Sequence, residues 1–318
     1  MDDVFDPQTA SQQDRFLKDV LDGLAKPKKT LPCQYFYDEA GSNLFEQITE
    51  LPEYYPMRTE IGILNTQAEA IASALGPRAL LVEYGAGAST KTRILLDALQ
   101  DPAGYVPIDV SEDFLLQTAD TLKTEYPDLA VHPIAADFMV ELGLPVDIDG
   151  TPVGFFPGST IGNLSDDEID QFLRAARRLL RSGSKFVIGV DLRKSPDILV
   201  PAYDDAQGVT AAFNMNLLER INRELGANFD LEAFEHQAIW NDEASRIEMH
   251  LRSLKPQSVK IGGTEIKFDA DETIHTENSR KFDLEKFVAL IGATGWTLRK
   301  DWRDDRDFFS VLLLEADD

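Results

Sequence analysis

The stretch LVEYGAGASTKTRILL, residues 81–96, decides the fold. Apolar residues run into a turn that contains Gly85 and Gly87, and a helical pattern follows the turn. A strand, a glycine turn and a helix in this order are typical of a nucleotide-binding loop in an α/β sheet. Because a GxG pair alone is a weak signal, the nucleotide has to be identified from the surrounding residues.

Short strands and helices alternate on both sides of this loop. The predicted strands are the apolar runs 79–85, 104–111, 129–138, 153–160 and 184–192, and helical patterns separate them over 89–100, 111–127 and 165–183. This alternation predicts a parallel sheet with helices on both faces. Ser165 and Glu168 predict a capping box at the start of the third helix. The runs 296–302 and 308–316 predict an antiparallel hairpin that closes the sheet.

The alternation breaks after Leu192, which predicts a second domain. Residues 193–230 are helical and aromatic, and residues 236–277 alternate like a β-meander with a GG turn at 262–263. The fold class is therefore α/β, a Rossmann-like sheet with a C-terminal antiparallel hairpin, plus a second α+β domain. We assign residues 58–194 and 281–318 to the nucleotide-binding domain, and residues 1–57 and 195–280 to a substrate-binding domain.

Composition excludes several classes of function. The net charge of −25 over 318 residues opposes binding to nucleic acids or anionic membranes, since both carry negative charge. No apolar run approaches the roughly 20 residues that cross a bilayer, and the N-terminus lacks a signal-peptide pattern, so a cytoplasmic location is expected. Cys33 is the only cysteine, and the four histidines show no HxH or HxxxH spacing, so no metal is expected. The absence of a heptad or apolar interface stripe predicts a monomer.

The glycine loop favours S-adenosylmethionine over a dinucleotide. Thr90 stands where the dinucleotide fingerprint requires its third glycine, and Glu83 places an acid just before the turn. Asp109, at the end of the second strand, suits a ribose of either cofactor, and an NAD-type ligand stays as the alternative. Asp137 and Phe138 end the third strand, where an acid and an aromatic ring can bind adenine. The predicted cofactor site comprises Gly85, Lys91, Asp109, Asp137 and Phe138.

Long stretches of the chain resemble the L-histidine Nα-methyltransferases of ergothioneine biosynthesis. They are QYFYDEAGSNLFEQITELPEYYPMRTE (34–60), EYGAGASTKTRILLDAL (83–99), FFPGSTIGNL (155–164), YDDAQGVTAAFNMNLLERINRELGANFD (203–230), RIEMHLRS (246–253) and IHTENSRKF (274–282). The resemblance implies a class I methyltransferase that transfers methyl groups from S-adenosylmethionine to the α-amine of L-histidine. Three transfers, through the mono- and dimethyl forms, give hercynine in the first step of the pathway.

The same resemblance implies a set of substrate-binding residues. Tyr54, Asn163 and Tyr203 match positions that hold the carboxylate and amino group of the substrate, and Glu277 and Ser279 match positions that hold the imidazole. Other matched positions line the pocket, namely Tyr37, Phe45, Gly158, Thr160 and Met249. Asn278, also counted with the site, departs from the apolar residue that the family has between Glu277 and Ser279.

The chemistry of methyl transfer agrees with these residue types, but alternatives stay open. Transfer from a sulfonium needs a positioned neutral amine and neither a metal nor a covalent nucleophile. Tyrosine hydroxyls and an Asn amide can bind a carboxylate without adding charge. Without the resemblance, Tyr54 and Met249 are also explained as core residues, and Asn163 as a turn or helix-cap residue before Ser165. Two other functions remain, an Nα-methyltransferase of another amino acid or small peptide, and a non-enzymatic module that binds S-adenosylmethionine.

Overall fold

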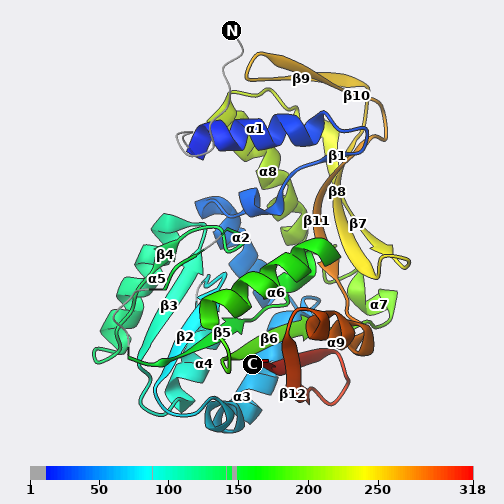
Figure 1. The fold of residues 1–318 in the computed structure, drawn as a ribbon. Coiled ribbons are helices and arrows are strands. Elements are labelled where there is room, and N and C mark those ends of the chain that lie inside the picture. The colour runs from blue at the N-terminus through cyan, green and yellow to red at the C-terminus, as the bar shows by residue number, and fades with distance from the viewer. Residues whose placement is uncertain (1–11, 88, 141, 145–148, 318) are drawn as a thin grey trace. The chain divides into compact units, whose positions relative to one another are not determined.

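The computed structural model describes residues 12–317, apart from residues 88, 141 and 145–148 (Figure 1). The chain divides into two compact units, Met1–Tyr54 with Ser195–Ser279, and Tyr55–Lys194 with Arg280–Asp318. We call the first the insert unit and the second the sheet unit. The domain boundaries expected from the sequence, at 57 and 280, lie three residues and one residue from these divisions.

The sheet unit contains a seven-stranded sheet with the order β12-β13-β6-β5-β2-β3-β4. Its strands are β2 (Ala79–Tyr84), β3 (Gly104–Asp109), β4 (Ile134–Ala135), β5 (Thr151–Phe156), β6 (Lys185–Asp191), β12 (Trp296–Arg303) and β13 (Phe309–Ala316). Its helices are α3 (Tyr55–Leu75), α4 (Thr90–Ala98), α5 (Glu112–Glu125), the 3-10 turn η2 (Thr160–Asn163), α6 (Asp166–Leu180) and α9 (Leu284–Ala293).

The strand directions confirm the predicted sheet. Strands β2 to β6 pair in parallel, whereas β13 runs antiparallel to both β6 and β12. The antiparallel pair β12–β13 is the predicted closing hairpin (Figure 1). Ser165 and Glu168 form the predicted capping box at the start of α6.

Both faces of the sheet are buried, which explains the nearly continuous apolar runs of its strands. On β2, Leu80 and Val82 join one core cluster with residues of α6 and α9. The alternate residues Ala79 and Leu81 join a second cluster with residues of α3, α4 and α5. The sheet is thus the middle layer between two sets of helices (Figure 1).

The third strand is shorter than predicted. The run 129–138 contributes only Ile134–Ala135 to β4, together with an isolated bridge between Val131 and Tyr105. Pro133 interrupts the run, and proline has no N–H to donate to a neighbouring strand.

Among the described residues, no helix is long and apolar enough to cross a membrane.

The insert unit is α+β, as predicted. Its strands form a sheet of order β1-β11-β8-β7 and a separate β9–β10 pair. They are β1 (Lys29–Thr30), β7 (Phe234–Asn241), β8 (Arg246–Ser253), β9 (Gln257–Ile261), β10 (Thr264–Phe268) and β11 (Thr273–Arg280). The helices are α1 (Gln12–Leu24), η1 (Cys33–Phe36), α2 (Glu39–Glu50), α7 (Pro196–Leu199), α8 (Val209–Leu225) and η3 (Leu231–Ala233).

Helix α8 is fixed to the four-stranded sheet by a buried asparagine. Asn214 donates from Nδ2 to the carbonyl of His250 at 3.0 Å and contacts His236 Nδ1 at 2.8 Å. Its Oδ1 accepts from the hydroxyl of Thr276 at 2.8 Å. These bonds tie α8 to β7, β8 and β11 at once.

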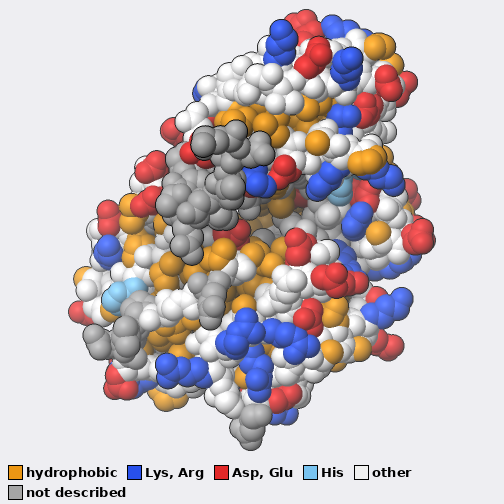
Figure 2. Space-filling model, turned by 45° about the horizontal axis from the view of Figure 1, so that its top comes forward, with side chains coloured by type: hydrophobic (Ala, Val, Ile, Leu, Met, Phe, Trp, Pro, Cys, Tyr) orange, Lys and Arg blue, Asp and Glu red, His pale blue; other side chains and the backbone are white. Residues whose placement is uncertain are grey.

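On the molecular face in Figure 2, acidic and basic side chains lie close to one another, although the net charge is −25.

Candidate active site

The glycine loop after β2 is shaped by backbone conformation. Gly85 and Gly87 have φ values of +70° and +48°, which side chains disfavour. A Cβ atom at either position would meet nothing within 4 Å, so the space beside the loop is open. The N–H of Gly85 donates to the carbonyl of Ile108 at 2.8 Å, which ties the loop to the end of β3. The loop can therefore admit a ligand close to its backbone.

Asp109 lies at the end of β3 and is bonded to this loop. Its carboxylate accepts the N–H of Gly87 at 3.2 Å and that of Ser111 at 2.9 Å. Burial raises the pKa of Asp109, and the two N–H bonds oppose that effect. A carboxylate has further lone pairs, so it can still accept bonds from two ribose hydroxyls.

Glu83, the acid before the turn, is part of the interior. It is 1% exposed and accepts from the hydroxyl of Thr92 at 2.5 Å and from that of Tyr105. Burial raises its pKa to about 8, although these hydrogen bonds and the charge of Lys91 act in the opposite direction. Glu83 therefore links β2 to α4 and β3 through buried hydrogen bonds, directly before the glycine loop.

Lys91 pairs with a carboxylate of α3 that sequence reasoning missed. Its Nζ lies 2.6 Å from Oε2 of Glu60, with the two side chains 12% and 1% exposed. Glu60 also accepts the N–H of Gly158 at 2.8 Å. A Cβ at Gly189 would come within 2.0 Å of Glu60, so glycine makes room for this carboxylate. Helical spacing was the available signal, since Glu60 lies on the same face of α3 as the buried Ile63 and Leu64.

Asp137 and Phe138 follow β4 directly. Asp137 accepts the N–H of Met139 at 2.8 Å. The ring of Phe138 packs edge-on against Phe156 and Phe172, at 5.3 and 5.5 Å between centroids. Phe138 is thus a partly buried residue at the edge of the core of the sheet unit.

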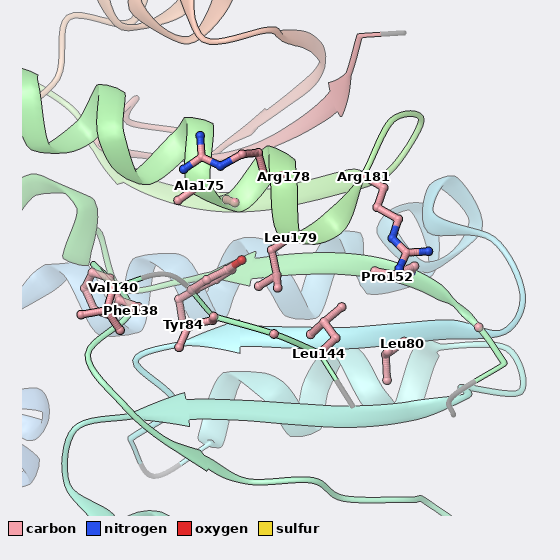
Figure 3. Close-up of a pocket in the computed structure, with 14 residues that line it drawn as sticks. Leu80, Tyr84, Phe138, Val140, Leu144, Pro152, Ala175, Arg178, Leu179 and Arg181 are labelled. Carbon is pink, nitrogen blue, oxygen red and sulfur yellow. The ribbon is translucent and has the colours of Figure 1, made fainter. Parts of the chain in front are cut away.

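A cavity of about 420 Å³ lies beside Phe138 in the sheet unit (Figure 3). Leu80 and Tyr84 of β2 and Leu179 of α6 line it, with Arg178 and Arg181 at its edge. The hydroxyl of Tyr84 is buried there and has no hydrogen-bond partner in the part of the chain that the structure describes. Apart from Phe138, none of the predicted site residues lines this cavity.

The segment FFPGSTIGNL forms a tight turn after β5. Gly158 has a φ of +82°, and its added Cβ would lie 3.2 Å from Lys91 Nζ. Thr160 donates from its hydroxyl to the carbonyl of Pro157 at 3.2 Å. Asn163 ends η2, and Ser165 is the residue that caps α6. Asn163 is therefore a turn residue before Ser165 and does not cap α6.

A buried ionic cluster, which the sequence did not reveal, supports this turn. Asp191, fully buried at the end of β6, contacts Lys194 and lies 2.8 Å from Lys281 Nζ and 2.6 Å from the hydroxyl of Tyr55. Its backbone N–H donates to the hydroxyl of Ser159 at 2.9 Å. Burial lowers the pKa of Lys194 to about 8, against the attraction of Asp191. Tyr55 is hence a core residue of the sheet unit, whereas its neighbour Tyr54 belongs to the insert unit.

In the insert unit, predicted aromatic residues from distant segments form a continuous row. Phe45 contacts Tyr37 and Tyr54 edge-on, at centroid distances of 5.7 and 6.3 Å. Tyr54 contacts Tyr203 at 6.0 Å. The hydroxyl of Tyr203 lies 2.6 Å from the hydroxyl of Ser279. Five predicted substrate residues are thereby brought together.

Tyr203 is held by residues on both sides of it. Its carbonyl contacts His236 Nε2 at 2.8 Å. Asp205 accepts the N–H groups of Val209 and Thr210 at 3.0 and 2.7 Å and so fixes the start of α8. Burial acts to raise the pKa of Asp205, but these N–H bonds hold it below its usual value. The YDD motif is thus an anchored turn, and Asp205 is a positioning residue that the prediction omitted.

The strand β11 carries the three remaining polar candidates. Glu277 and Asn278 are half-buried, and Ser279 is 7% exposed. Asn278 Oδ1 is buried and finds no hydrogen-bond partner among the residues that the structure describes, which is uncommon for a buried oxygen. Met249 of β8 is 1% exposed, and its carbonyl accepts from the hydroxyl of Thr276 on β11 at 3.0 Å. Met249 is therefore packed in the core of the unit next to β11.

The sheet topology, the open glycine loop and Asp109 define a class I methyltransferase that uses S-adenosylmethionine. The fold agrees with the crystal structure of an S-adenosylmethionine-dependent methyltransferase from Clostridium acetobutylicum, with a TM-score of 0.51 and 11% identity over 87% of this chain and 99% of that one.

Residues 16–316 match the family model described as histidine-specific methyltransferase, SAM-dependent, and the chain belongs to that family. It is 43% identical to the histidine N-alpha-methyltransferases of Mycolicibacterium smegmatis and Mycobacterium tuberculosis. Each alignment covers 93% of both chains. The resemblance described from the sequence is thereby confirmed, and so is S-adenosylmethionine as the methyl donor.

Proposed function

We propose that this protein methylates the α-amino group of L-histidine three times, giving hercynine as the first step of ergothioneine biosynthesis. The family and the names of the two mycobacterial relatives support this assignment. The observation that carries it is the aromatic row that ends at the hydrogen bond between Tyr203 and Ser279. The row gathers residues from three distant segments of the chain and ends at two hydroxyls that can hydrogen-bond a polar substrate.

The sheet unit is proposed to bind S-adenosylmethionine, which supplies the electrophilic methyl group. The open space beside Gly85 and Gly87 fits a ligand chain that runs close to the backbone. Asp109 is assigned to the ribose, and Asp137 and Phe138 to the adenine. Lys91 is assigned to the cofactor site as well, with Glu60 holding its ammonium in place.

The polar groups proposed for the amino-acid end of histidine carry no charge. The hydroxyls of Tyr54 and Tyr203 and the amide of Asn163 can hydrogen-bond a carboxylate without placing a cation beside the amine. That choice matters because the amine must lose a proton before each transfer and ends as a quaternary cation. An adjacent Lys or Arg would disfavour that product.

Aromatic faces stabilise the product instead. Tyr37 and Phe45 are proposed to offer their rings to the methylated ammonium, an interaction worth about 0.5–2 kcal/mol. Gly158, Thr160 and Met249 are proposed to line the rest of the site. Most of the acceleration then arises from holding amine and methyl group in line.

The imidazole is proposed to bind along β11. Glu277 can accept from one ring N–H, and the hydroxyl of Ser279 can serve the other nitrogen. Asn278, between Glu277 and Ser279, is proposed to contribute to the site through its backbone. A competitor without an imidazole leaves these groups unpaired, which costs about 1–3 kcal/mol per group.

The enzyme is further proposed to be monomeric and cytoplasmic, with a small-molecule substrate and no nucleic-acid or membrane partner. The net charge of −25 supports the proposal that nucleic acids and membranes are not partners. The reaction itself requires no metal ion, because the sulfonium is already an activated methyl donor. Light scattering at several protein concentrations measures the molar mass in solution.

The decisive experiment offers the purified protein S-adenosylmethionine with each of the common amino acids and follows the products by mass spectrometry. We expect histidine to gain one, two and three methyl groups, and the mono- and dimethyl forms to be consumed. If another amino acid or a small peptide reacts and histidine does not, the specificity assignment fails. If the cofactor binds in calorimetry but nothing is methylated, the protein is a binding module.

A further inference from the structure

A second cluster of polar side chains lies on the four-stranded sheet of the insert unit. On β8, Glu248 and His250 alternate with buried apolar residues, so they share the opposite face of the strand. His275 lies on the adjacent strand β11. One ligand atom from each of the three side chains lies within 4.8 Å of the other two. The side chains of His250 and Glu248 are only 12% and 14% exposed.

The two imidazoles present nitrogen lone pairs. His275 Nε2 lies 3.0 Å from the carbonyl of Glu277, so it donates there and leaves Nδ1 as the acceptor nitrogen. His250 Nδ1 is buried and has no hydrogen-bond partner among the described residues, so it can carry the ring proton while Nε2, beside Glu248, offers its lone pair. The rings are stacked at 4.9 Å between centroids.

Glu248 is an anion that is held in place through one oxygen. Its Oε1 accepts from Asn241 at 2.9 Å and from Arg246 at 2.7 Å. Its Oε2 faces His250 Nε2 at 3.2 Å. Outer hydrogen bonds of this kind orient carboxylate ligands in metal sites.

We propose that Glu248, His250 and His275 form a binding site for a divalent transition-metal ion, with Zn²⁺ as the ion to test. Two imidazoles and one carboxylate are an established zinc ligand set that leaves a fourth position for water. Bonds of about 2.0–2.1 Å in a tetrahedron place neighbouring ligand atoms about 3.3 Å apart. The distance of 3.2 Å between Glu248 Oε2 and His250 Nε2 matches that spacing. The ligand atom of His275 lies within 4.8 Å of the other two.

The ligands lie on two strands, which explains why histidine spacing along the sequence gave no sign of the site. The pairing of β8 with β11 creates it. The cluster adjoins the proposed imidazole site, since His275 Nε2 donates to the carbonyl of Glu277, so the test measures metal binding itself rather than methyl transfer. The positive charge of Arg246 opposes a second cation, so the affinity should lie below that of a three-histidine site.

The test titrates Zn²⁺ into the full-length, tag-free protein after treatment with a chelator, by calorimetry and by competition with a chromophoric chelator. Co²⁺ provides an absorption spectrum that reports nitrogen and oxygen ligation. We expect one ion per chain, no binding of Mg²⁺ under the same conditions, and a metal-dependent rise in the Tm.

Two ligand variants, one variant of the outer hydrogen-bond donor Asn241 and one control make the result specific. Glu248→Gln and His275→Ala should weaken Zn²⁺ binding at least 100-fold, and Asn241→Ala about 10- to 100-fold. His132→Ala, a histidine of the sheet unit, should bind as the wild type does. Glu248→Gln keeps the side-chain shape and is expected to fold, which circular dichroism checks. The proposal is overturned if the wild type does not bind Zn²⁺, or if Glu248→Gln binds it equally well.

Discussion

Replacing Glu60 by glutamine isolates the buried ion pair beneath the proposed cofactor site. Glu60 Oε2 lies 2.6 Å from Lys91 Nζ, in an environment where the two side chains are 1% and 12% exposed. The same carboxylate accepts the N–H of Gly158 at 2.8 Å. Glutamine keeps the shape and an acceptor for Gly158, but it removes the charge. Lys91 is then a nearly buried cation without its counter-ion.

The size of the effect follows from these contacts. Removing one partner of a buried pair costs about 3–5 kcal/mol, because the other charge is left uncompensated. The retained bond to Gly158 and the slight exposure of Lys91 favour the lower end, about 3 kcal/mol. For a unit of this size, about 2–4 °C in Tm corresponds to 1 kcal/mol, so Tm should fall by about 6–12 °C.

Urea and thermal unfolding of four variants measure the interaction free energy between Glu60 and Lys91. The set is Glu60→Gln, Lys91→Met, the double variant, and Glu69→Gln as an exposed control on the same helix. The control should stay within about 0.5 kcal/mol of the wild type. The double variant should be more stable than the sum of the single effects by at least about 1 kcal/mol. Additive effects, or a Glu60→Gln protein as stable as the wild type, would refute the reasoning.

Three further predictions address the substrate and the interior. Glu277→Ala should lower kcat/KM for histidine by about 10- to 150-fold, since a charged hydrogen bond contributes about 1.5–3 kcal/mol. The affinity for S-adenosylmethionine, measured by calorimetry, should stay unchanged, and an equal loss of both quantities would remove Glu277 from the imidazole site. Tyr203→Phe deletes the 2.6 Å contact with Ser279 and should raise KM for histidine several-fold, whereas the control Tyr126→Phe should not. Burial raises the pKa of Glu83 to about 8, so the native state keeps a proton that the unfolded state loses near pH 4.5. The wild type should therefore lose stability as pH rises from about 5 to 8, by at most about 1.4 kcal/mol per pH unit, and Glu83→Gln should abolish that slope in urea titrations.

The sequence predicted the sheet well because its signals are local. The glycine loop, the capping box of Ser165 and Glu168, and the closing hairpin each depend on neighbouring residues, and all three are present. The error in β4 was also local, because Pro133 interrupts an otherwise apolar run. Such features can be derived from spacing and residue type without knowledge of the tertiary contacts.

The candidate sites depend on contacts between distant segments, and spacing could not reveal them. Glu60 and Lys91 come from different helices, and Glu248 and His275 from different strands. Glu60 was nevertheless detectable in principle, because an acid on the buried face of α3 must find a cation or a donor. No comparable rule applies to His275, since alternation in a strand says which face a residue occupies but not which strand lies beside it. The resemblance to the family, rather than periodicity, predicts that Tyr203 and Ser279 belong to one site, and their hydroxyls are in contact in the structure.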